Sequence, residues 1–124
     1  MNVTGTDFVC MPTQDFETAE KFYGDTLGLQ RSHRWGNMPA REFETGSLTI
    51  AVMQMDAFGQ TFAPNHGALA LQVEDVHAAR EELEAAGVQF VYDTIDSGVC
   101  HMAHFKDPDG NALMFHHRYA PKDQ

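Results

Sequence analysis

Two stretches of the chain carry apolar residues at the three- and four-residue intervals of an amphipathic helix. The first runs from Asp15 to Gly28 and the second from Asp75 to Gly87. Each begins with an aspartate, which can accept hydrogen bonds from a helical first turn, and ends with a glycine, which tolerates the left-handed backbone after a helix. The spacing therefore predicts two similar helices.

Short segments of alternating side chains, which are typical of β-strands, stand before and after each helix. The segments before the helices are Phe8–Pro12 and Ala68–Val73; those after them are Gln30–Trp35, Ala40–Glu44, Leu48–Met55, Val88–Tyr92, Val99–Lys106 and Ala112–Arg118. Each half of the chain is thus predicted to be β-α-β-β-β, and residues 56–66, rich in Gly, Pro and Asn, form a linker.

Charge and length restrict the partners of the chain. It has 124 residues, enough for one domain with its own core, and a formal charge of −10 that argues against nucleic acid and anionic membrane. Its cysteines, Cys10 and Cys100, match no CxxC motif. Without an evident signal peptide or an apolar run of ~18 residues, we expect a cytoplasmic protein.

The order of these features resembles the vicinal oxygen chelate superfamily, which includes glyoxalase I, extradiol dioxygenases and bleomycin-resistance proteins. The resemblance rests on the tandem βαβββ pattern, on "AEKFYGDTLGL" in the first helix and on "DPDGN" before the last strand. It covers about Thr6 to Tyr119 and implies a single α+β domain, in which modules at about 6–55 and 67–119 curl their sheets around a shared cavity. It also implies a homodimer.

The resemblance further implies four metal ligands, from the first and last strand of each module. The matching positions here are Phe8, Ala68, Met114 and, by face parity, Ala51. None supplies the imidazole or carboxylate that divalent ions prefer, and one soft methionine sulfur does not make a site. We therefore expect no metal cofactor and a bulky, partly apolar ligand, unless Phe8 and Met114 fill the cavity themselves.

Strand parity in the last hairpin predicts which side chains face the cavity. If Phe105 and Leu113 pair across the turn and face the helices, the opposite side carries Cys100, Met102, His104, Met114 and His116. His104 then lies opposite Met114 and diagonal to His116. Two alternatives to simple binding follow: a relocated metal site of both histidines completed by Glu42 or Cys100, or a histidine acting as general base.

In the first module, Phe43 is expected to face the helix, which turns Glu42 and Glu44 inward. A carboxylate there can serve as a base or as a cation receptor; the alternatives are a salt bridge to Arg41 or Arg34, or exposure at the sheet edge.

Trp35, the only tryptophan, can stack on a planar or cationic ligand or pack at a dimer interface. The leading hypothesis is metal-free binding of a small, partly apolar organic molecule, cationic or aromatic, as in the drug-sequestering branch of the family. The second is a lyase, isomerase or dioxygenase-type enzyme with His104, His116 or Glu42 as catalytic candidates, and the third is a scaffold with a filled cavity. The predicted ligand-binding residues are Phe8, Cys10, Trp35, Glu42, Ala68, Ala70, Cys100, Met102, His104, Met114 and His116.

Overall fold

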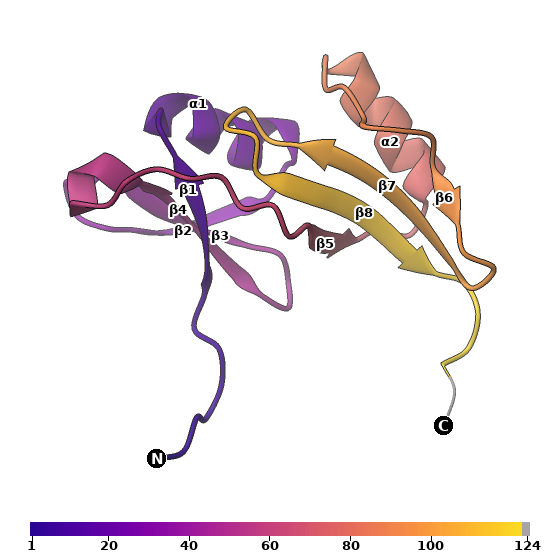
Figure 1. Cartoon of the computed structure of the whole chain (residues 1–124), viewed down its shortest axis with the longest axis horizontal. Helices are drawn as coiled ribbons and strands as arrows, with labels where there is room; N and C mark the ends of the chain where they lie inside the picture. Colours follow the sequence, from indigo (N-terminus) through magenta and orange to yellow (C-terminus); the bar gives the residue numbers. More distant parts are fainter. Residues whose placement is uncertain (123–124) are drawn as a thin grey trace. The chain divides into compact units, whose positions relative to one another are not determined.

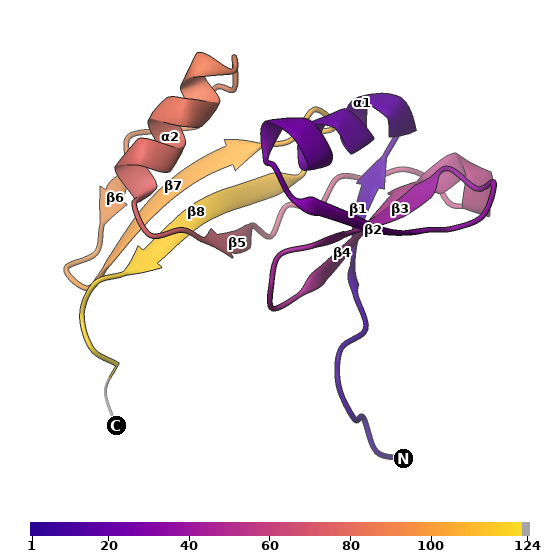
Figure 2. The same cartoon turned by 180° about the vertical axis from the view of Figure 1, so that it is seen from behind.

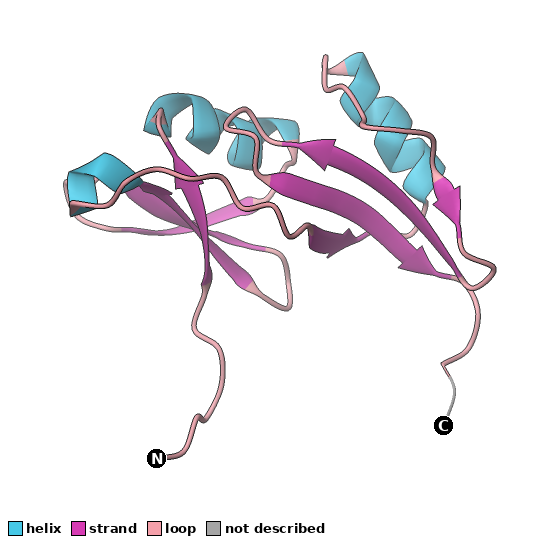
Figure 3. Cartoon of the chain, viewed as in Figure 1, coloured by secondary structure: helices cyan, strands magenta, loops and turns pink. Residues whose placement is uncertain are grey.

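The computed structural model describes residues 1–122, and the chain divides into two compact units, residues 1–64 and residues 65 onward. Each unit has the element order β-α-β-β-β, so the predicted α+β fold of tandem modules is confirmed (Figures 1 and 3). The assignment of both modules to one domain stays a prediction. No helix within residues 1–122 is long and apolar enough to cross a membrane.

The first unit contains a four-stranded mixed sheet in the order β1-β4-β3-β2. Its strands are β1 (Val9–Thr13), β2 (Gln30–Arg34), β3 (Ala40–Glu44) and β4 (Thr49–Gln54). β1 runs parallel to β4, and the other neighbours are antiparallel. A 3-10 helix, Met55–Phe58, follows β4 at the start of the predicted linker.

Helix α1 (Phe16–Lys21) begins at the predicted N-cap. The Asp15 carboxylate accepts hydrogen bonds from the Thr18 backbone N–H at 3.3 Å and from its hydroxyl at 2.8 Å. These bonds favour the charged carboxylate, and they lower the pKa of Asp15. The cap therefore fixes where the chain turns from β1 into the helix.

The prediction of one continuous helix up to Gly28 is wrong in its second half. Phe22–Thr26 forms a π-helical turn, in which the Leu27 N–H donates to the Phe22 carbonyl at 2.8 Å. The guanidinium of Arg31 lies in the space that a Cβ at Gly24 of this turn would occupy. The wider turn thus accommodates an arginine from β2, a contact that helical periodicity does not reveal.

The core of the first unit lies between its sheet and the helical segments. Met11, Phe43 and Ile50 are buried on the covered face, and the Tyr23 ring packs on Phe43 with centroids 6.0 Å apart. The opposite face of each sheet, which no helix of its own unit covers, is called the open face below.

The second unit repeats this arrangement in the strand order β5-β8-β7-β6. Its elements are β5 (Leu69–Gln72), α2 (Val76–Ala85), β6 (Ile95–Asp96), β7 (Cys100–Lys106) and β8 (Ala112–Arg118). The Asp75 carboxylate caps α2 by accepting the Ala78 N–H at 3.0 Å, and Gly87 follows the helix with φ of 92°. α2 packs on β7 and β8 (Figure 2).

The predicted strand Val88–Tyr92 is wrong. Only Phe90 forms a bridge there, with Phe105, and the outer strand of the sheet is the short β6. The Arg80 side chain donates to the Tyr92 carbonyl at 2.9 Å and stacks its guanidinium 4.7 Å from the Phe90 ring centroid. This helix arginine takes up a carbonyl that a regular ladder would use, so the segment pairs only locally.

The DPDGN turn between β7 and β8 is held by a buried side-chain network. The Asp107 carboxylate accepts the backbone N–H groups of Asp109 and Asn111 at 2.9 Å each and the Asn111 side-chain amide at 2.7 Å. The Asn111 amide oxygen accepts the Asn65 N–H at 2.8 Å. One turn therefore anchors both the hairpin and the segment that leads into β5.

Replacing Asn111 by Ala removes two of these buried side-chain hydrogen bonds. We expect Asn111→Ala to lower the free energy of unfolding by about 1–3 kcal/mol in urea denaturation. Lys106→Ala, an exposed change at the adjoining end of β7, is the matched control and is expected to stay within about 0.5 kcal/mol. Equal effects of the two changes would contradict the role of the network.

Candidate functional site

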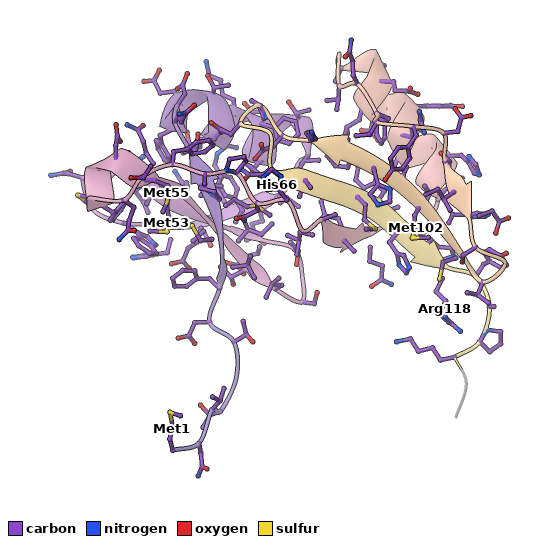
Figure 4. All side chains as sticks on the ribbon, viewed as in Figure 1. Met1, Met53, Met55, His66, Met102 and Arg118 are labelled. Atoms are coloured by element: carbon purple, nitrogen blue, oxygen red, sulfur yellow. The ribbon has the colours of Figure 1, made fainter. Side chains whose placement is uncertain are left out.

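Strand parity places several of the predicted ligand-binding residues on the open face of the first unit. Phe43 is fully buried under the helical segments, so its neighbours Glu42 and Glu44 project from the other side of β3. Across the sheet, Ala51 pairs with both Glu42 and Cys10. Met53, two residues further along β4, lies on the side away from α1 (Figure 4).

A β-bulge in β2 brings Trp35 to this face. Arg31 pairs with Phe43 and Arg34 with Arg41, so β2 contains one residue more than β3 in the same interval. Both Arg31 and Arg34 consequently face the helix, and the Arg34 guanidinium lies 4.6 Å from the Phe16 ring centroid. The next residue, Trp35, is thereby turned to the open face, as bulges commonly redirect side chains.

Trp35 is fixed there by a hydrogen bond and by two aromatic contacts. Its indole N–H donates to the Glu42 carboxylate at 2.8 Å. The Phe8 ring stands at 76° to the indole with centroids 5.6 Å apart, and the Phe58 ring at 90° with centroids 6.0 Å apart. We call Phe8, Trp35 and Phe58 the aromatic cluster. Sequence reasoning missed Phe58, because it lies in the linker, outside any periodic segment.

The salt bridge considered for Glu42 is absent, because both candidate arginines are engaged elsewhere. Arg41 pairs with Glu20 of α1 at 3.3 Å, and Arg34 stacks on Phe16. Within residues 1–122, the Trp35 indole is the one group that hydrogen-bonds the half-buried Glu42 carboxylate. Glu42 is thus oriented by a neutral donor, and its negative charge is not compensated by an ion pair within the described chain.

Glu44, on the same strand, has a different environment. Its carboxylate accepts the Ser32 hydroxyl and the Thr49 hydroxyl, each at 2.6 Å. These bonds, Ser32 first, lower the pKa of Glu44. A carboxylate whose charged form is stabilised in this way is a poor base at neutral pH, so Glu44 is not a candidate for general-base catalysis.

The lowered pKa of Glu44 links stability to pH. The folded chain binds the Glu44 proton less readily than the unfolded chain, whose ordinary value is 4.5. The stabilisation by the two hydroxyls is therefore complete above that pH and is lost as the pH falls through the lower folded-state pKa. In an NMR carboxyl titration, Thr49→Val is expected to move the pKa of Glu44 upward. An unchanged midpoint would contradict this assignment.

The open face of the second unit has the register that the sequence predicted. His104 pairs with Met114 and Met102 with His116, and the Phe105–Leu113 pair faces the helix. Met102 projects from β7 on the side away from α2 (Figure 4). The parity and the diagonal placement of His104 and His116 are confirmed.

β5 adds small residues to this face. Ala70 pairs with Met114 on β8, and Ala68 comes one residue before the strand begins. At the far end of the hairpin, the Arg118 guanidinium lies 3.9 Å from the sulfur of the buried Cys100. The open face of the second unit therefore consists mainly of alanine, methionine and histidine side chains.

His104 has an aromatic neighbour that sequence reasoning placed in a regular strand. The Tyr92 ring lies against the His104 ring with centroids 5.1 Å apart, and Tyr92 itself is half exposed. The Nδ1 atom of His104 is buried and has no hydrogen-bond partner within residues 1–122. The imidazole therefore keeps one buried nitrogen whose hydrogen-bonding capacity the described chain does not use.

The residues at the four positions where the sequence resemblance implies metal ligands do not fit a divalent metal. Phe8, Ala51, Ala68 and Met114 carry no nitrogen or oxygen in their side chains, and divalent ions in proteins take such ligands. Among residues 1–122, no three His, Cys, Asp or Glu side chains come together as a possible metal site. A relocated site would therefore need ligands of another type beside its histidines.

The cysteine on the first open face is not activated as a nucleophile. Burial raises the pKa of the Cys10 thiol, so the reactive thiolate is less populated at neutral pH. The protonated Cys10 thiol, next to Ala51, contributes apolar surface to the open face.

The open faces of the two units carry equivalent rows of side chains. In each row, a residue of the first strand, one of the last strand and one polar residue are in register, and an aromatic ring lies against the polar residue. The rows are Cys10, Ala51, Glu42 and Trp35 in the first unit and Ala70, Met114, His104 and Tyr92 in the second. The internal repeat thus keeps a polar group beside an aromatic ring in each sheet but changes its chemistry from carboxylate to imidazole.

Comparison with known proteins agrees with this fold. A family model described as the Glyoxalase/Bleomycin resistance protein/Dioxygenase superfamily matches residues 5–115. A curated relative, the uncharacterized protein YraH of Bacillus subtilis (strain 168), is 27% identical over 111 residues, covering 80% of this chain and 87% of YraH.

Solved structures give the same result. A putative glyoxalase family protein from Bacillus anthracis has a TM-score of 0.77 and 22% identity, covering 95% of this chain and 98% of its own. Lactoylglutathione lyase from Agrobacterium tumefaciens has a TM-score of 0.76 and 16% identity, covering 93% and 94%. At these identities the likeness shows the fold alone.

Proposed function

Because the chain belongs to the glyoxalase/bleomycin resistance protein/dioxygenase superfamily, we propose that it binds a small, partly apolar organic molecule on the open faces of its sheets without a metal cofactor. Proteins of this superfamily bind small molecules. Binding sites for such ligands combine apolar and aromatic walls with a few fixed polar groups. The open faces have this composition.

The observation that carries the proposal is the pair of equivalent rows. Each row presents one polar residue beside an aromatic ring, Glu42 with Trp35 and His104 with Tyr92. The strand positions next to them hold alanine, cysteine and methionine. Apolar area supplies affinity on such a surface, while the carboxylate of the first row, or the imidazole of the second, orients a ligand bound on its own open face.

Catalysis by a histidine is the second candidate. The specific observation in its favour is the buried Nδ1 of His104, which lacks a hydrogen-bond partner within residues 1–122. An imidazole is suited to proton transfer near neutral pH. His104→Asn tests this candidate. If the protein turns over a candidate substrate, and the variant loses the turnover but still binds the substrate, catalysis is favoured over binding alone.

A library of small natural products and drugs, screened by thermal shift, tests the binding proposal. A ligand at a hundredfold excess over its Kd should stabilise the protein by ~2.7 kcal/mol. The shift caused by a ligand on the first open face is expected to be lost or strongly reduced in Trp35→Leu, and that caused by a ligand on the second open face in His104→Ala, because each change removes one member of the row concerned. His33→Ala, an exposed change on β2, is the control that should keep the full shift. Shifts that survive both site changes would place the ligand elsewhere.

We also propose that the protein forms a homodimer, as the family resemblance implies. The half-exposed side chains of Val91 and Tyr92 and the nearby Ile95 leave apolar surface at the outer edge of the second sheet, which an interface could cover. Sedimentation at micromolar concentration is expected to give about twice the chain mass of 13.8 kDa. A mass of one chain at every concentration would contradict the dimer.

A further inference from the structure

We propose that the ligand carries an organic cation, an ammonium or guanidinium group on a carbon skeleton, and that this group binds at Glu42 beside the aromatic cluster of Phe8, Trp35 and Phe58. This inference rests on the proposed function, since it names the class of molecule that the open face of the first unit selects.

The first argument is the uncompensated charge of Glu42. Three other carboxylates of this unit have partners: Asp25 pairs with Arg31 at 3.1 Å, Glu20 pairs with Arg41 at 3.3 Å, and Glu44 accepts two hydroxyls at 2.6 Å. Glu42 receives one indole N–H, to its Oε2 atom. Its other oxygen accepts no hydrogen bond from the residues that the structure describes.

This imbalance discriminates between ligands. A neutral molecule that covers the half-buried Glu42 would remove water from a carboxylate without replacing its hydrogen bonds, which is costly. A ligand with a positive charge at the same place would instead form a charge-assisted contact with the vacant oxygen. The carboxylate thus penalises neutral ligands and favours cations.

The second argument is the arrangement of the rings. The Phe8 and Phe58 rings stand at 76° and 90° to the indole of Trp35, and in a perpendicular pair at least one ring keeps both of its faces clear of the other. Organic cations are attracted to such faces within about 6 Å of the ring centroid, and tryptophan is the strongest of these partners. Because the indole N–H reaches the Glu42 carboxylate at 2.8 Å, a cation at this carboxylate would lie close to the ring system of Trp35.

An inorganic ion fits this place less well. Ca²⁺ and Mg²⁺ require about six or more oxygen ligands, whereas the cluster supplies one carboxylate and three hydrocarbon or indole rings. An alkylammonium or guanidinium group matches the mixture, because its carbon atoms contact the rings while its charge meets Glu42. The net charge of −10 also raises the local concentration of cations.

Two isosteric probes separate charge from shape: choline, with a trimethylammonium group, and 3,3-dimethylbutan-1-ol, in which carbon replaces the charged nitrogen. Binding is followed by the fluorescence of Trp35, the only tryptophan, and by NMR line shifts. We expect choline to bind about tenfold more tightly than the alcohol, as a cation–π contact and an ion pair together imply.

Glu42→Gln keeps the side-chain size and an oxygen acceptor for the Trp35 N–H. We expect this substitution to weaken the binding of choline about tenfold and to leave the binding of the alcohol unchanged. The matched control is Glu44→Gln, which removes the same charge from the same strand and face but from a carboxylate that two hydroxyls already satisfy. It should change choline binding less than twofold. Phe8→Leu, at the exposed end of the cluster, should weaken choline several-fold and provides a second variant with little risk to folding.

Equal affinity for the two probes in the wild-type protein, or no detectable binding of choline, would overturn the inference. Equal losses of choline affinity in Glu42→Gln and Glu44→Gln would also overturn it, because the effect would then reflect net charge alone. These outcomes leave the proposed function standing if neutral library compounds still give thermal shifts that depend on Trp35 or on His104. If no library compound binds either, the proposed function fails as well.

Discussion

Strand register is the constraint on which the rest of this structure depends, because successive side chains of a strand point to opposite faces of the sheet. In the second unit, the buried Asp107–Asn111 network fixes the turn between β7 and β8. That turn sets His104 opposite Met114 and keeps Phe105 under the helix. A shift by one residue would bury the imidazole and expose the phenyl ring. The composition of the open face is therefore a consequence of one turn.

In the first unit, the β-bulge in β2 determines which side chains reach the open face. The extra residue in β2 leaves two arginines on the covered side and turns Trp35 to the open face. There the indole N–H donates to the Glu42 carboxylate, and the indole contacts two phenylalanine rings. Arg41 and Glu20 neutralise each other on the covered side, so the charge of Glu42 is left for a partner outside the described residues. An irregularity in pairing thus creates the chemistry of this face.

The two units show how a repeated scaffold changes its chemistry by single substitutions. The same register positions hold Glu42 and His104, and each has an aromatic neighbour. The four positions where the sequence resemblance implies metal ligands carry phenyl, methyl and thioether groups, which suit apolar contacts rather than divalent ions. In the proposed binding function, apolar contacts would supply affinity on each open face, and its one polar residue would supply selectivity.

The sequence by itself determined what depends on local periodicity and capping: both helix starts at Asp15 and Asp75, the turn at residues 107–111 and the parity of the last hairpin. Only the tertiary structure decided the features that rest on contacts between distant segments. The π-helical turn accommodates the Arg31 guanidinium. The segment at 88–92, expected to be a strand, instead has its Tyr92 carbonyl hydrogen-bonded by Arg80. Phe58, from the predicted linker, contacts the Trp35 ring. Local patterns record hydrogen bonds and burial within one element, whereas these features follow from side chains that a distant element supplies.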